Sequence, residues 1–241
     1  MSSLSSSHSQ HAPYDVADVG LVRPGWPEIS VGLGVFSLVG FGGGAALVHS
    51  GLDAAVIGLI LTAWTGIAGL AAFAAAASIR LRSWSAFGVR ATSGRWLLIG
   101  VGMGVVAFVL KGIAVIAFTW LTGLQSNPQS IFVPGAGSAM MTIVLATIFF
   151  GVLTPIGEEF LFRGVLTNAL LRYGPIIGVV GSALIFALLH GINVVFPAAL
   201  VAGLIAGEVF RRSGSIWPAV IVHVMFNLPS IPMMMLVSAA Q

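Results

Sequence analysis

The chain has 241 residues, of which 58% are hydrophobic and only 7% are charged, and its mean hydropathy is +1.06. A soluble globular domain carries about 25% charged residues, so this composition excludes a soluble globular protein and predicts a polytopic protein of the cell membrane. The absence of cysteine excludes disulfide bonds, thiolate metal sites and a cysteine nucleophile. The net charge of +3 does not indicate nucleic-acid binding, because the basic residues cluster near the ends of apolar runs.

The chain starts with a polar, serine-rich stretch over residues 1–28. This stretch lacks a basic region that leads directly into a short apolar core, which is the pattern of a signal peptide. We therefore expect a flexible N-terminal tail on the cytoplasmic side of the membrane.

Residues 29–138 predict three membrane-spanning helices, because a span needs about 20 apolar residues. The apolar runs cover residues 29–49, 54–78 and 96–122. The loop between the second and third runs is the most basic segment, and we expect it inside the cell with the N-terminus, because cytoplasmic loops concentrate Lys and Arg. The loop over residues 125–138 is uncharged and suits the outer side. The arginines of the basic loop are Arg80, Arg82, Arg90 and Arg95.

Residues 139–237 form a less regular apolar unit. A break is expected at Thr154-Pro155, and Gly174-Pro175 is a strong turn signal. Arg211 and Arg212 follow the fourth run of this unit and again indicate the inner side. The whole chain is predicted to be all-α, with about seven to eight transmembrane helices. The apolar runs of this unit are 139–153, 158–173, 176–190, 194–209 and 216–237.

Charged residues inside a bilayer cost about 2.5–3.5 kcal/mol each, so each one needs an explanation. Glu208 lies three and four residues before Arg211 and Arg212, and this spacing predicts an ion pair at a helix end. Lys111 lies in the middle of the third predicted span. We interpret its long side chain as reaching the interface or an internal partner.

Glu158 and Glu159 are adjacent, but their surroundings on a helix differ. Glu159 and Arg163 are four residues apart with the glutamate first, which is the better order for a helical ion pair. Glu158 points about 100° away around the helix and has no cation at that spacing. Such a carboxyl group is either packed in its neutral form against a neighbouring helix or a base that acts on water.

Three further polar residues, His190, His223 and Asn227, lie in the apolar runs. His223 and Asn227 share one helix face, where they either form hydrogen bonds between helices or offer two adjacent donors. A lone histidine such as His190 is more often a packing residue. A hairpin that turns at Gly174-Pro175 covers about 22 Å and returns about 21 Å, so it brings His190 back to the level of Glu158.

These residues form three motifs, which resemble those of one family of membrane proteins. In this order and on apolar segments, they resemble the CAAX protease and bacteriocin-processing (CPBP) family of intramembrane glutamic endopeptidases, which includes the type II CAAX prenyl endopeptidases. The resemblance covers residues 139–236, and residues 1–138 show no such signal. The motifs are EExxxR at Glu158, Glu159 and Arg163, FxxxH at Phe186 and His190, and HxxxN at His223 and Asn227.

The resemblance implies a catalytic role for four of these residues. Glu158 would activate a water molecule as the general base, and His190 would hold the same water. His223 and Asn227 would form the oxyanion hole. Residues 139–237 would then be the catalytic bundle.

The resemblance also implies supporting residues and partners. Glu159 and Arg163 would orient the site through their ion pair, and Phe186 would be a packing residue. The implied reaction is hydrolysis of peptide bonds in a membrane-associated protein or peptide, without a cofactor. The expected partners are this substrate and membrane lipid, and nucleic acid is not expected.

Two alternatives stay open on the residues alone. Glu158, Glu159, His190 and His223 could supply metal ligands, although Glu159 is better matched to Arg163, and we expect no metal. The same polar cluster could instead serve a non-catalytic transporter, immunity protein or scaffold. The sequence shows neither a Ser–His–Asp pattern nor an HExxH zinc signature, so a glutamate acting on water is the preferred hypothesis.

Overall fold

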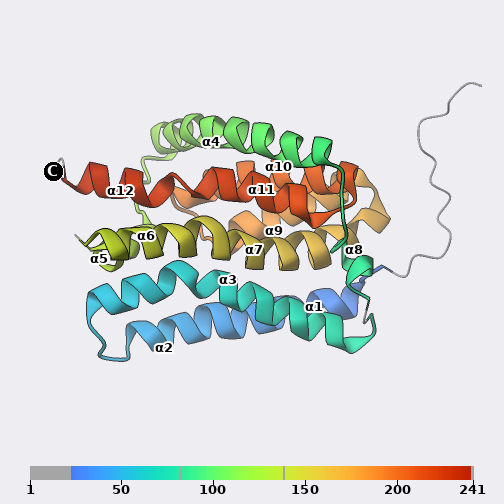
Figure 1. Ribbon diagram of the computed structural model, residues 1–241, viewed down its shortest axis with the longest axis horizontal. Coiled ribbons are helices and arrows are strands. Elements are labelled where there is room, and N and C mark those ends of the chain that lie inside the picture. The colour runs from blue at the N-terminus through green and yellow to red at the C-terminus, as the bar shows by residue number, and fades with distance from the viewer. Residues whose placement is uncertain (1–22, 82, 138, 240–241) are drawn as a thin grey trace, which may run out of the picture.

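A computed structural model of the protein describes residues 23–81, 83–137 and 139–239, and within these ranges the chain forms helices and turns without a strand (Figure 1). The predicted all-α fold is confirmed. Residues 1–22 of the predicted tail, and Arg82 of the basic loop, lie outside the described residues.

The helices follow the predicted order along the chain. The N-terminal part contains α1 (Trp26–Phe36), the π-helical segment Ser37–Gly43, α2 (Gly44–Val48), α3 (Ala54–Ile79) and α4 (Gly94–Thr122). The C-terminal part contains α5 (Phe132–Ala136), α6 (Met140–Ile148), α7 (Thr154–Glu159), α8 (Asn168–Leu170), α9 (Ser182–Leu189), α10 (Val195–Ser213), α11 (Ile216–Asn227) and α12 (Ser230–Ala239). Further π-helical segments are Phe149–Leu153, Phe160–Thr167 and Ile177–Gly181, and short 3-10 turns are Trp84–Phe87, Pro128–Ile131 and Leu171–Tyr173.

Five helices of the described chain are long and apolar enough to cross a membrane, which fits a multi-pass membrane protein. Two predicted spans, residues 176–190 and 194–209, are not among these five helices. The apolar helix Ile177–Leu189 is shorter, and α10 carries three charged residues, Glu208, Arg211 and Arg212, within its 19 residues. The five helices are Trp26–Val48, Ala54–Ile79, Gly94–Thr122, Met140–Tyr173 and Ile216–Leu236.

The predicted break at Thr154-Pro155 is wrong, because one helix runs from Met140 to Tyr173. The π-helical segment Phe149–Leu153 ends two residues before the proline, and the N–H of the intervening Thr154 donates to the Phe149 carbonyl five residues back. A widened turn of this kind accommodates a proline ring inside a continuous helix.

Helix α1 begins at Trp26, three residues before the predicted start of the first span. Glu28 is fully buried and accepts a hydrogen bond of 2.7 Å from the Gly25 N–H. The Arg80 guanidinium donates two hydrogen bonds of 2.8 Å to the same carboxylate, which ties the start of α1 to the end of α3. This paired carboxylate raises the pKa of Arg80 above its usual value. The helix extends into the polar stretch because this charge is capped and paired.

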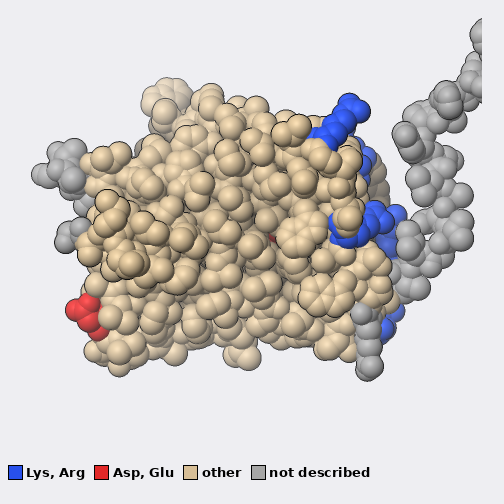
Figure 2. Space-filling model, in the orientation of Figure 1, with Lys and Arg blue, Asp and Glu red and all other residues tan. Residues whose placement is uncertain are grey.

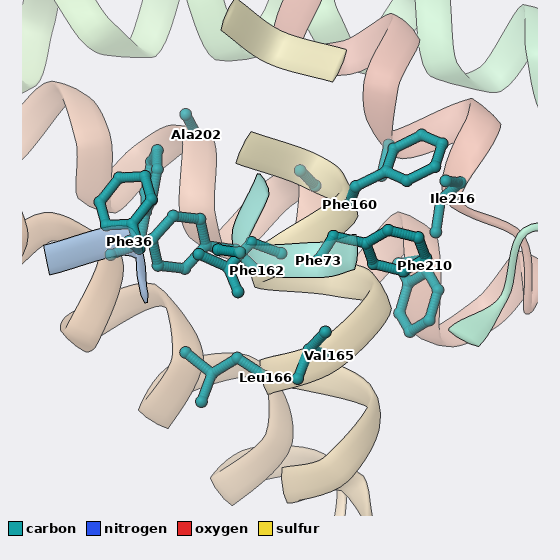
Figure 3. Packing of buried hydrophobic residues seen from close by; sticks show 14 of the residues in the cluster. Phe36, Phe73, Phe160, Phe162, Val165, Leu166, Ala202, Phe210 and Ile216 are labelled. Atoms are coloured by element: carbon teal, nitrogen blue, oxygen red, sulfur yellow. The ribbon is translucent and has the colours of Figure 1, made fainter. Parts of the chain in front are cut away.

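The helices lie side by side along the long axis of the molecule, and α7 occupies the centre. It packs between α3 and α11, while α1 covers the far side of α3 and α4 covers α11 (Figure 1). Aromatic rings fill the space around α7, as the edge-on contact of Phe73 with Phe160 at 5.0 Å between centroids shows (Figure 3). The residues next to the two glutamates are therefore held in a packed core.

Glycines allow α3 and α7 to approach each other closely beside the two glutamates. A β-carbon added to Gly157 would lie 1.8 Å from the carbonyl oxygen of Gly66. The Thr154 hydroxyl donates a 2.9 Å hydrogen bond to the Thr62 carbonyl across the same contact. Small residues permit this kind of backbone approach between membrane helices. The contact fixes the position of α7.

Apart from the buried Arg163, arginines of the described chain gather at one end of the molecule. Arg80 and Arg172 both lie beside Gly25, and Arg90 donates to the carbonyl of Gly214, which follows Arg211 and Arg212 in the chain. Figure 2 shows Lys and Arg side chains at one end of the visible face, and the opposite end of this face carries an acidic group and no basic one. The bundle therefore has one basic end.

We predict that Gly157→Ala destabilises the protein by at least about 1–3 kcal/mol, the usual cost of an overpacked contact, because its β-carbon would meet the Gly66 carbonyl. The matched control is Gly102→Ala on α4, where no atom beyond the adjacent residues and the surrounding backbone of the same helix lies within 4 Å of the added carbon. Thermal unfolding of both variants in detergent tests this. Equal melting temperatures would contradict the close contact.

Candidate active site

Both glutamates of the EExxxR motif lie on α7, which has a π-helical segment on each side, Phe149–Leu153 and Phe160–Thr167. Glu158 is 3% exposed and Glu159 is fully buried. π-Helical turns inside α-helices frequently occur at functional sites, where they turn side chains away from the regular helical positions. The local backbone thus singles out the turn that carries the two carboxylates.

The predicted ion pair of Glu159 and Arg163 is present, with 3.0 Å between Glu159 Oε2 and Arg163 Nε. Arg163 is almost fully buried, and its Nη2 donates to the carbonyls of Ala202 and Gly203 on α10 at 3.4 and 3.3 Å. The guanidinium therefore neutralises Glu159 and joins α10 to the helix that carries both glutamates.

His223 on α11 contacts both carboxylates. Its Nδ1 lies 2.8 Å from Glu159 Oε1, and its Nε2 lies 3.9 Å from Glu158 Oε2. The contact with Glu159 was not foreseen, because the two residues are 64 positions apart and no helical spacing relates them. Glu159 is thus held by Arg163 and His223, whereas Glu158 has only the longer contact with His223.

Asn227 lies one helical turn beyond His223, and its side chain is fixed by the backbone of the helix that carries the two glutamates. In the π-helical register, the carbonyl of Phe150 would accept from the N–H of residue 155, but this residue is Pro155 and has no N–H. The Asn227 amide nitrogen donates to this carbonyl at 3.3 Å. One N–H of the amide is used in this way, and the second remains for another acceptor.

His190 ends α9, and its ring is oriented by the FxxxH motif. Its Nδ1 lies 2.8 Å from the Phe186 carbonyl, which leaves Nε2 as the nitrogen that can bind a ligand. The Phe186 ring contacts the rings of His190 and His223 at centroid distances of 4.7 and 5.9 Å. The Arg163 guanidinium also lies 5.2 Å from the Phe186 ring centroid. Phe186 is therefore a packing residue between the two histidines.

A cavity of about 510 Å³ brings the candidate catalytic residues together. Glu158, His190, His223 and Asn227 all line it, although they come from three different helical segments, α7, the end of α9 and α11. Glu159 and Arg163 are not part of the lining and lie behind it. The four residues predicted to be catalytic thus face one space, and the two predicted to orient them do not.

The donor groups do not fit a metal site. Both oxygens of Glu159 are occupied, one by Arg163 and the other by His223. Within the described parts of the chain, no group of three or more His, Asp or Glu side chains is arranged to hold a metal ion. What the cluster offers is one carboxylate without a cation, two imidazoles and one amide around a common space.

We predict that Arg163→Met destabilises the protein by about 3–5 kcal/mol, because it leaves the buried Glu159 carboxylate without its cation. The matched control is Arg212→Met. Arg212 forms the predicted ion pair with Glu208, but its side chain is 63% exposed, so its loss should cost no more than about 1 kcal/mol. Thermal unfolding in detergent compares the two, and equal destabilisation would contradict the structural role of Arg163.

Comparison with known proteins agrees with the motifs. Residues 140–229 match the family model described as type II CAAX prenyl endopeptidase Rce1-like. No curated protein and no solved structure matches the chain. The matched range contains every residue of the three motifs, from Glu158 to Asn227. Residues 140–229 are therefore an Rce1-like domain of the type II CAAX prenyl endopeptidase (CPBP) family, which implies a membrane protease with a protein substrate.

Proposed function

We propose that the protein is an intramembrane endopeptidase that hydrolyses peptide bonds of a membrane-associated protein or peptide with a glutamate-activated water. The observation that carries this proposal is the shared cavity of Glu158, His190, His223 and Asn227. Peptide hydrolysis requires a water, a base that takes its proton, and donors at the oxygen where negative charge develops. The four side chains supply the base and the donors around one space, which is open to a water.

In the proposed reaction, a water is held between the Glu158 carboxylate and Nε2 of His190. Glu158 takes a proton from this water while the water oxygen attacks the scissile carbonyl carbon. The carbonyl oxygen becomes negatively charged and accepts hydrogen bonds from His223 and from the second N–H of Asn227. The proton on Glu158 then passes to the leaving amine, which restores the carboxylate.

The oxyanion role requires a proton on Nε2 of His223. Because Nδ1 donates to the Glu159 carboxylate, both ring nitrogens carry a proton only in the imidazolium form.

The proposed enzyme lies in the cell membrane with its N-terminus and arginine-rich end on the cytoplasmic side, because basic ends face inward. Helix α4 starts at this end and has 29 residues, so it reaches about 43 Å across the bundle. The segment after it, Asn127 to Gln129, lines the active-site cavity. Substrate therefore reaches the site from the outer half of the membrane.

We predict that Glu158→Gln lowers the hydrolysis rate by at least about 10²–10⁴-fold, since the amide cannot take a proton from water. The assay incubates purified protein with a proteome-derived peptide library in micelles and identifies new termini by mass spectrometry. The matched control is Glu208→Gln, which removes a carboxylate of the basic end and should cut at the wild-type rate. Unchanged cleavage by the Glu158 variant would exclude the mechanism, and the absence of cleavage by wild type would favour a non-catalytic role.

The orientation can be tested with single cysteines, because the natural chain has none. Gln125 and Ser85 are both exposed, the first after α4 and the second in the turn before it. We predict that a membrane-impermeant maleimide labels Gln125→Cys on intact cells and labels Ser85→Cys only after lysis. The reverse pattern would contradict the proposed orientation.

A further inference from the structure

Lys111 lies inside the bundle rather than at the interface. It follows the start of α4 by 17 residues, or about 26 Å, so its charge lies far from the basic end. Its Nζ donates to the Phe226 carbonyl at 3.3 Å and to the Ser230 hydroxyl at 3.1 Å. It also lies 4.5 Å from the centroid of the Phe226 ring. Of the two predicted interpretations of Lys111, the side chain that reaches the interface is wrong. The side chain instead has internal partners, and these are uncharged oxygen atoms.

Within the described chain, Lys111 has no acidic partner. Glu28 is paired with Arg80, Glu159 with Arg163, and Glu208 with Arg211 and Arg212. Asp53 caps the start of α3, and the ion-pair distance of Glu158 is to His223. A cation held by neutral acceptors in an apolar bundle keeps an attraction for any anion that reaches it.

The ammonium of Lys111 faces the active-site cavity. Lys111 and Ser230 both line the cavity that contains Glu158, His223 and Asn227. An ammonium has three N–H donors, and two of them reach oxygen atoms, while the rings of Phe108 and Phe226 lie 4.6 and 4.5 Å from Nζ. A bound molecule in this cavity can therefore meet a full positive charge and a donor that has no oxygen acceptor in the described chain.

The cation lies at a short distance from the proposed site of hydrolysis. Ser230 follows Asn227 by three residues and His223 by seven, which corresponds to about 5 and 10 Å along the helix direction. An extended peptide covers about 3.3 Å per residue. An anionic group of a bound peptide can thus reach Lys111 from about three residues away from the scissile bond.

We propose that Lys111 forms an anion-binding subsite of the active-site cavity and receives a carboxylate of the bound peptide. The inference rests on the proposed peptidase function, since the peptide that carries the carboxylate is the substrate. One ammonium balances one carboxylate, and Glu158 in the same cavity disfavours a ligand with more negative charge. The carboxylate comes either from a free C-terminus or from an Asp or Glu side chain, and both would form the same charge-assisted hydrogen bond.

Binding is tested in the Glu158→Gln variant, so that the probes are not cut. The probes are three apolar eight-residue peptides with fluorescein at the N-terminus. One has a free C-terminal carboxylate, one has a C-terminal amide, and one has the amide and an aspartate two residues before the end. Fluorescence anisotropy in micelles measures their affinities. We expect at least one carboxylate probe to bind about tenfold or more tightly than the uncharged amide probe.

The matched variant is Lys111→Gln, whose amide can still donate to the Phe226 carbonyl but carries no charge. We expect it to bind all three probes with the affinity of the uncharged probe, and Lys111→Arg to retain the preference. The comparison of the three probes in the Glu158→Gln protein needs no change at Lys111, so it decides the matter even if Lys111→Gln fails to fold. Equal affinities for all probes, or no binding of any, would overturn the subsite.

The three probes also separate the two carboxylate sources and the two proposals. Tight binding of only the first probe assigns the subsite to a free C-terminus, and tight binding of the aspartate probe assigns it to an acidic side chain. Charge-dependent binding combined with no cleavage by the wild-type protein would support the anion site and contradict the peptidase. Cleavage without charge-dependent binding would support the peptidase and contradict the anion site.

Discussion

Two carboxylates are buried next to each other on α7, and the rest of the site depends on how they differ. Glu159 is bound by Arg163 from its own helix and by His223 from α11. These contacts neutralise one of two adjacent charges and fix the ring of His223. Glu158 then faces the cavity without a cation, with only a 3.9 Å contact to His223. A buried pair of this kind is valuable less for stability than for the single arrangement it enforces.

The backbone around α7 supports the same arrangement. The contact of Gly66 with Gly157 sets the distance between α3 and α7, and the π-helical segments on both sides of α7 interrupt the regular hydrogen bonds. Pro155 leaves the Phe150 carbonyl without a backbone donor, and Asn227 fills this place. A proline in the helix that carries the two glutamates thus fixes an amide on another helix, and the fold and the candidate site are formed by the same residues.

Patterns within one helix were readable from the sequence, and contacts between helices were not. The four-residue spacing predicted the pair of Glu159 with Arg163, and the three-residue spacing predicted that of Glu208 with Arg211. The contact of His223 with Glu159 joins distant helices, so no periodicity signals it. Thr154-Pro155 was predicted as a break because a π-helical turn has no sequence pattern. The inward direction of Lys111 depends on which face of α4 packs on α11, and an apolar helix does not reveal this.

In the proposed mechanism, Glu158 and His190 hold the reacting water, and His223 and Asn227 are donors on its far side. An experimental structure of the detergent-purified protein, at a resolution that shows ordered water, tests this most directly. We predict a water within hydrogen-bond distance of Glu158 and of Nε2 of His190, with no metal ion in contact with either residue. A metal ion bound by Glu158 and a histidine, or side chains of Glu158 and His190 that face separate spaces, would contradict the account.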